Sequence, residues 1–339
     1  MRIVRPSHHP ATTRRHMLAT GVGGLGLALL PAGRALAQVR GNQFQFGSAT
    51  LGSTGYVIIE GLSTIVNRHS DLQTSSQSTS GGAENVALIG QSVLDFGQST
   101  SVDLVAAREG AAPYGTRIDV RQMFCYTTFN LPPIVRAESD IQRFADLAGR
   151  RISPGAAGGT TAQSWRLMFE NSGFGDSVRW TYGSWRETYD GFMAGNIDCI
   201  PAVLTNLQPS PIVTELTTNY PVRPVSFPEE LIAVAQAANP GIMRFEVTPE
   251  TWPHLSEPVV ATGSSGILAA HPSVSAEVGY EITRTVFAHL EELHGIAQVL
   301  TSVRLEDATR YLVAGVPVNA GAAQFFKEQG VWRDDLTEA

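Results

Sequence analysis

Four segments of the sequence place glycines and hydroxyl side chains directly after a predicted strand: residues 47–55, 78–82, 154–161 and 261–266. Glycine lets backbone N–H groups approach a ligand, helix N-termini favour negative charge, and Ser and Thr add donors without fixed charge. Tight turns and helix caps use the same residue types, so each segment alone has two interpretations. Because three of the four precede a predicted helix, together they favour a binding site for a small molecule with an anionic group.

The sequence lacks the common signatures of catalysis and of nucleotide binding. It contains no GxxxxGK[ST], no GxGxxG after a strand, no GxSxG and no HExxH. His289 and His294 are five residues apart, about 140° around a helix, so they do not share a face that could hold a metal ion. We therefore expect no catalytic residues, no metal and no cofactor. A hydrolase or synthase would need a nucleophile with a base in reach.

The N-terminus has the pattern of an export signal. Arg14 and Arg15 precede an apolar run over residues 17–30, and Ala35-Leu36-Ala37 offers the small-x-small pattern that signal peptidases cut. We expect twin-arginine export to the periplasm with cleavage near Ala37. An uncut N-terminal anchor is the alternative. Residues 38–339 then carry 19 basic and 31 acidic residues, a net charge of −12, which argues against a nucleic-acid partner.

Strand and helix patterns alternate from residue 44 onward, which predicts an α/β fold with parallel sheets covered by helices. Strands are expected over residues 44–48, 72–77, 94–98, 121–124, 133–136, 151–153, 178–182 and 197–203. Helices are expected over 56–67, 84–93, a short stretch from 139, 160–171, 184–194, 278–293, 305–313 and 320–328. Proline-rich segments at 130–133, 207–228 and 248–258 read as loops or crossovers. They predict one lobe over 38–131 plus 261–339, and a second over 132–260.

The predicted site lies where strands end, on the edges of the two sheets that face each other. On the first lobe it comprises Ser48, Thr50, Ser53, Thr54, Gly55, Tyr56, Thr79, Ser80, Gly81, Gln98 and Ser99. On the second lobe it comprises Gly158, Gly159, Thr160, Thr161 and Trp185. Arg136 or Arg186 could add a bidentate partner, or could lie on an exposed helix face. Cys125 and Cys199 fit buried free thiols, with a disulfide as the alternative.

Several segments are similar to the TAXI family of TRAP-transporter substrate-binding proteins. The similarity rests on residues 78–85, 135–152, 154–160 and 315–322, and it extends over essentially the whole mature length. It implies a periplasmic, two-lobed fold of the periplasmic-binding-protein type (type II), hinged and closing on a small organic solute such as a carboxylate or amino acid. It also implies a monomer that docks on a fused large-plus-small TRAP membrane subunit. A sensor that presents its ligand to a histidine-kinase ectodomain would need the same features, so both partners stay open.

Overall fold

The computed structural model describes residues 41–339, where the chain forms thirteen strands in two sheets. The strands are β1 (Gln43–Gly47), β2 (Gln73–Gln77), β3 (Phe96–Thr100), β4 (Arg121–Asn130), β5 (Pro133–Arg136), β6 (Arg151–Ile152), β7 (Arg179–Trp180), β8 (Cys199–Pro201), β9 (Leu204–Thr205), β10 (Gln208–Pro209), β11 (Val222–Pro224), β12 (Met243–Val247) and β13 (Val259–Ala270). The first sheet has the order β10-β9-β4-β13-β3-β1-β2, with β12 also paired to β13. The second has the order β11-β5-β8-β6-β7.

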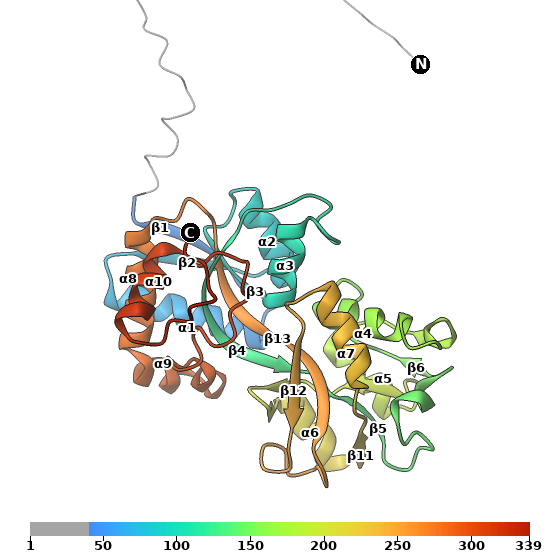
Figure 1. Ribbon diagram of the computed structural model, residues 1–339. Coiled ribbons are helices and arrows are strands. Elements are labelled where there is room, and N and C mark those ends of the chain that lie inside the picture. The colour runs from blue at the N-terminus through green and yellow to red at the C-terminus, as the bar shows by residue number, and fades with distance from the viewer. Residues whose placement is uncertain (1–40) are drawn as a thin grey trace, which may run out of the picture. The chain divides into compact units, whose positions relative to one another are not determined.

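Ten α-helices within residues 41–339 cover these sheets (Figure 1). They are α1 (Thr54–His69), α2 (Gly82–Gly90), α3 (Ser101–Glu109), α4 (Thr160–Glu170), α5 (Trp185–Met193), α6 (Pro211–Asn219), α7 (Glu229–Ala238), α8 (Ala276–Ala288), α9 (Leu290–Ile296) and α10 (Ala320–Glu328). One buried apolar core lies between the first sheet and α1, α8 and α10, and two smaller cores lie around the second sheet. The predicted α/β class with two sheets is therefore confirmed, but the sheets are mixed and not parallel: β13 is antiparallel to β3, β4 and β12, and parallel pairs join only β1 to β2 and β3 and β6 to β7 and β8 among the described residues.

The two longest strands of the first sheet are β4, with 10 residues, and β13, with 12 residues. Residues 266–270 of β13 pair with β3, residues 259–263 pair with β12, and residues 263–270 pair with β4 on the other side. In Figure 1, β13 accordingly runs from the part that holds β3 into the part that holds β12. The chain passes to the second sheet between Asn130 and Pro133, at the predicted double-proline crossover.

The lobe boundaries proposed from the sequence stay a prediction. Residues 42–339 form one compact unit, and β9, β10 and β12, from within 132–260, pair with strands of the first sheet. The predicted signal peptide, residues 1–37, lies outside the described residues. Among the described residues, no helix combines the length and the apolar character that crossing a membrane requires. Cys125 and Cys199 are buried free thiols, and burial raises the pKa of both.

Several elements differ from the sequence-based expectation. The small residues at 261–266 belong to β13 and not to a ligand loop. Two of them are glycines because β4 lies close to β13 at these positions. A Cβ atom on Gly263 would lie 2.0 Å from the Phe129 carbonyl oxygen, and one on Gly266 would lie 2.5 Å from the Tyr126 ring. Residues 305–313 form turns instead of a helix, and the proline-rich segment 207–228 contains α6 and β11. The sequence reasoning missed α3.

Candidate functional site

The carboxyl ends of β1, β2 and β3 meet at one edge of the first sheet, because β1 is parallel to both neighbours. The buried side chain of Gln98, near the end of β3, lies at the centre of this edge. A Cβ atom on Gly55 would lie 3.2 Å from Gln98 Oε1, and one on Gly81 would lie 3.5 Å from Gln98 Nε2. Tyr126 fixes the amide by donating from its hydroxyl to Gln98 Oε1 over 2.9 Å. The first residues of α1 and of α2 therefore converge on Gln98.

Buried Asn85 holds these loops together from the first turn of α2. Its Nδ2 donates to the carbonyl oxygens of Gly47, Ser48 and Gln98 at 3.2, 2.7 and 2.8 Å. Thr79 Oγ1 donates to the Ser48 carbonyl over 3.0 Å, so its hydroxyl is used within the loop. The hydrogen bonds of Asn85 and Thr79 therefore fix the shape of this sheet edge without a ligand.

On the second sheet, β6 and β7 are parallel and lead towards α4 and α5. Ser184 caps α5 in the predicted capping box with Glu187, which places Trp185 at the first position of that helix. The Trp185 ring lies against Gly155, whose φ of +92° and close ring contact (3.1 Å from a Cβ to Cη2) leave no room for a larger residue. The indole remains 37% exposed, so it borders the 154–160 loop and can contact a solute.

The two sheets meet through a hydrogen-bonded contact between α3 and α4. Thr160 Oγ1, at the N-terminus of α4, donates to Asp103 Oδ1 over 3.2 Å. Thr100, the N-cap of α3, donates to Asp103 Oδ2 over 2.9 Å. Beside this contact, Ser101 Oγ donates to the Gly241 carbonyl over 2.6 Å, which joins the start of α3 to the turn between α7 and β12. Figure 1 shows the start of α3 next to α4 and α7.

Asp103 is a carboxylate held away from water at this contact. It is 2% exposed, and burial raises its pKa to about 6, while the hydrogen bonds from Thr100 and Thr160 limit the rise. No Lys or Arg forms an ion pair with it among residues 41–339. Arg136 instead bonds the carbonyls of Phe192 and Ile197, and exposed Arg186 faces acidic neighbours. Both arginines therefore bind groups other than those at the contact between α3 and α4.

The structure brings together part of the predicted residue set. Around Gln98 it gathers the loops that carry Ser48, Gly55, Thr79 and Gly81, and from the second sheet it brings Thr160 against the first. Other members have local roles or lie apart from that group: Ser53 caps α1, Ser80 bonds Glu84, and Thr50 and Gly158 are exposed. Gln98 accepts its side-chain hydrogen bond from Tyr126 and not from Thr54, Tyr56, Gly159 or Thr161. The Ser99 hydroxyl is buried without a hydrogen-bond partner. The sixteen residues remain a predicted site.

The sequence reasoning missed Asp103, Thr100, Tyr126 and Asn85. A signal existed for the first two, because a Thr followed three residues later by an acid is a helix-start pattern. Asn85 lies in the segment that resembles the TAXI family, where it was noted but given no role. Tyr126 carries no sequence signal, because only the fold brings it to Gln98.

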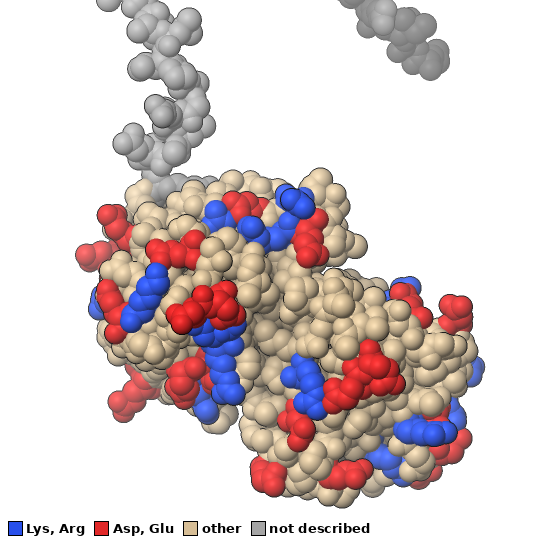
Figure 2. Space-filling model, in the orientation of Figure 1, with Lys and Arg blue, Asp and Glu red and all other residues tan. Residues whose placement is uncertain are grey.

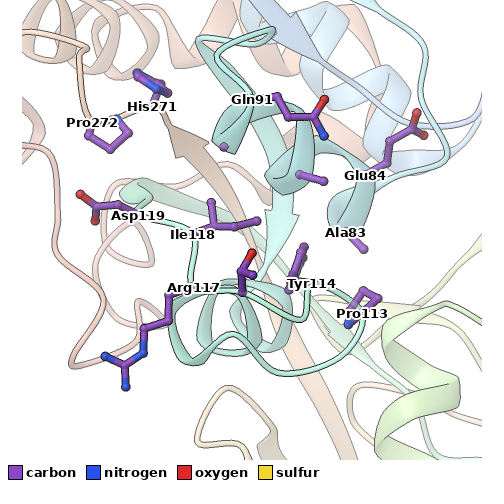
Figure 3. A pocket seen from close by; sticks show the side chains of 13 residues that line it. Ala83, Glu84, Gln91, Pro113, Tyr114, Arg117, Ile118, Asp119, His271 and Pro272 are labelled. Carbon is purple, nitrogen blue, oxygen red and sulfur yellow. The ribbon is translucent and has the colours of Figure 1, made fainter.

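A hollow of about 620 Å³ lies elsewhere on the first sheet's side. Figure 3 shows it bordered by α2 on one side and by residues 113–119 on the other, with His271 and Pro272 at its rim. None of the predicted site residues lines it. Its open, mixed lining of Glu84, Arg117 and Asp119 lacks the converging loops found at Gln98, so we place the candidate site at the contact of the two sheets.

One family model matches most of the chain. The model of the NMT1-like family matches residues 46–330. The chain belongs to this family. A search of curated proteins found no match.

Solved structures share the overall fold. A protein of Bordetella bronchiseptica RB50 matches with a TM-score of 0.50 at 14% identity, covering 87% of this chain and 91% of that one. The periplasmic aliphatic sulphonate binding protein SsuA of Escherichia coli matches with a TM-score of 0.46 at 14% identity, covering 85% and 90%. Lactococcal OpuAC, complexed with glycine betaine, matches with a TM-score of 0.48 at 8% identity, covering 72% and 82%. At these identities the likeness concerns the fold alone.

Proposed function

We propose that this protein is an extracytoplasmic solute-binding protein that captures a small organic solute between the helices of its two sheets. The observation that carries the proposal is the meeting of glycine-lined strand ends around Gln98 with the start of α4 at Thr160. Helix N-termini and hydroxyls from two separate sheets then face one place, which suits a ligand enclosed when the sheets approach. Membership of the NMT1-like family and the α/β fold agree with a binding role.

The finer assignment is a solute receptor of a TAXI-type TRAP transporter. Two of the segments that resemble the TAXI family, residues 78–85 and 154–160, lie at the candidate site, one on each side of the contact. In this role the protein acts as a monomer without catalysis and delivers its solute to a fused membrane subunit. On the face shown in Figure 2, acidic and basic side chains are interspersed, with no broad basic surface for nucleic acid.

A thermal-shift screen of the purified protein tests the binding role. The probes are carboxylates, amino acids and aromatic acids, each at millimolar concentration. A solute present at 100 times its dissociation constant adds about 2.7 kcal/mol to the free energy of unfolding, a shift of several degrees. A stabiliser whose effect falls by about half when Thr160 is replaced by Val, as tenfold weaker binding requires, supports the proposal. The absence of any stabiliser across the three classes contradicts it.

Export is a separate part of the proposal and has its own test. Arg14, Arg15 and the Ala35-Leu36-Ala37 pattern motivate a periplasmic location. Mass spectrometry of protein purified from the periplasm is expected to show Gln38 as the first residue. Replacing both arginines by Lys should leave the chain unprocessed in the cytoplasm. A periplasmic protein that still begins with Met1 would show that the segment is not a cleaved signal.

A further inference from the structure

Asp103 is a buried acid whose hydrogen-bond partners are all neutral. Its oxygens accept from the hydroxyls of Thr100 and Thr160, and a Cβ atom on Gly82 would lie 2.4 Å from Oδ2, so the carboxylate also lies against the start of α2. Burying an ionised carboxylate without a cation is costly, because hydroxyl donors replace water only in part. A chain that keeps such a group at the junction of two sheets carries an unfavourable charge that a cation would relieve.

Helix capping does not account for the burial of Asp103. Glu84, Asp146 and Glu187 also lie in the first turn of a helix. Each accepts hydrogen bonds from residues just before its helix, from the Ser80 hydroxyl and N–H for Glu84 and chiefly from backbone N–H groups for Asp146 and Glu187, and these bonds hold the pKa of each below its ordinary value. Asp103 likewise accepts bonds from the Thr100 hydroxyl and backbone. Among them only Asp103 is buried and has its pKa raised. The other three acids cap their helices without being buried, so capping alone does not explain why Asp103 is buried.

Among residues 41–339, the hydrogen-bond partners of Asp103 are neutral donors, and no basic group pairs with it. The titratable groups that sense its charge are the phenols of Tyr114 and Tyr126, and burial raises the pKa of both, so they stay protonated near neutral pH. Thr160 is the side chain that reaches Asp103 from the second sheet. A solute group that entered between α3 and α4 would lie beside the Thr160 hydroxyl, where it meets the carboxylate.

We propose that Asp103 is the residue that selects the solute, by binding an ammonium group that enters between α3 and α4. This inference rests on the proposed solute-binding function and deepens it, because it names the chemical class of the solute. An ammonium group donates three hydrogen bonds and carries the charge that Asp103 lacks. The rest of the solute, including a carboxylate if it has one, lies towards the glycine-lined starts of α1 and α2 beside Gln98. An amino acid or amine is bound, whereas a plain carboxylic acid is not.

The test uses matched pairs of probes that differ in the amino group. Amino acids are compared with the 2-oxo acids of the same carbon skeleton, and simple primary amines are added, by thermal shift and then by calorimetry at pH 7.5. We expect stabilisation by at least one amine-bearing probe and none by its 2-oxo partner. Asp103→Asn should weaken binding of that probe by about 10- to 100-fold, the contribution of one charge-assisted hydrogen bond.

The control variant is Asp146→Asn, which removes a first-turn acid whose bonds come from Gln142 and Arg143 and not from the residues of the contact. It should bind the amine-bearing probe as the parent does. Binding of 2-oxo acids at least as strong as that of the amino acids, or unchanged amine binding in Asp103→Asn, overturns the inference while the solute-binding function stands. If neither amines nor acids bind, the proposed function fails and the inference falls with it.

Discussion

Replacing Asp103 by Asn should make the ligand-free protein more stable at neutral pH. Asn has the shape of Asp and keeps an oxygen that accepts a hydrogen bond, while its amide can donate to a hydroxyl that turns to accept. The substitution therefore removes the buried charge and disturbs little of the contact between Thr100 and Thr160. Such a gain is expected where a chain keeps a residue for its function although that residue lowers the stability of the fold.

The size of the gain follows from the pKa of Asp103. In the folded protein the pKa is raised from 3.8 to about 6, and each pKa unit corresponds to about 1.4 kcal/mol. Because the folded state binds this proton more tightly than the unfolded state does, stability falls as the pH rises from about 4 to about 6. Above pH 6 the full penalty, about 3 kcal/mol, is present. The loss of one hydrogen bond from a hydroxyl lowers the free energy of unfolding of the variant by about 1 kcal/mol. The variant is therefore expected to be more stable than the parent by about 2 kcal/mol at pH 7.5.

Urea unfolding of the parent and the variant at pH 4 and at pH 7.5 measures this difference. At pH 4 the two should be equal within about 1 kcal/mol, because Asp103 is then protonated in the folded parent. Asp146→Asn provides a control of opposite sign: backbone N–H bonds lower the pKa of Asp146, so this variant should lose stability at pH 7.5 and not at low pH. An Asp103→Asn variant that is less stable than the parent by the same amount at both pH values would refute the reasoning.

Three further predictions concern the contacts around the site. Gly241→Ala should destabilise the protein by about 2 kcal/mol or more in urea unfolding, because the new Cβ atom would lie 2.4 Å from the Ser101 carbonyl oxygen; Gly295→Ala, with open space around it, should cost less. Asn85→Ala should cost about 3 kcal/mol in the same assay, because three carbonyl oxygens lose their donor, and a cost below 1 kcal/mol would contradict this. Calorimetry of the amine-bearing probe should show weaker binding at pH 5 than at pH 7.5, since Asp103 is protonated at the lower pH; equal affinity would contradict it.

The alternation of elements was predictable because local patterns carry it. Strand β1 and helices α1, α4, α5 and α10 fall close to their expected ranges, since an apolar stripe or a capping residue marks each. Helix α3 was missed because residues 101–107 are all buried, so no polar face reveals the helical period. The contact that brings Asp103 into the site was missed with it.

Two predicted helices failed because arginines from distant segments bind the carbonyl oxygens. Arg223 donates to the carbonyls of Ser139 and Ile141, where a helix was expected, and a 3-10 helix begins only at Phe144. Arg333 likewise donates to carbonyls at residues 309, 310 and 312, which a helix over 305–313 would have needed for its own bonds. Local sequence predicts a helix in both places, and tertiary hydrogen bonds override it.

The candidate site was predictable in part for a similar reason. Strand ends followed by glycines can be recognised in the sequence, and the parallel pairing of β1 with β2 and β3 brings two of them to one edge, beside the end of β3. The partners of these loops come from far along the chain: Tyr126 to Gln98, and Thr160 to Asp103. Such pairs depend on the arrangement of the sheets, which single-residue patterns do not contain.

The most direct test of the solute-binding account is calorimetry on three single variants, Thr160→Val, Thr79→Val and Ser99→Ala. The titrant is the probe that gives the largest thermal shift among the carboxylates, amino acids and aromatic acids. The account predicts that Thr160→Val, which removes the hydroxyl at the contact of the two sheets, folds and binds about tenfold more weakly, a loss of about 1.4 kcal/mol. Unchanged affinity in all three variants would contradict it, because the solute would then bind somewhere other than between the two sheets.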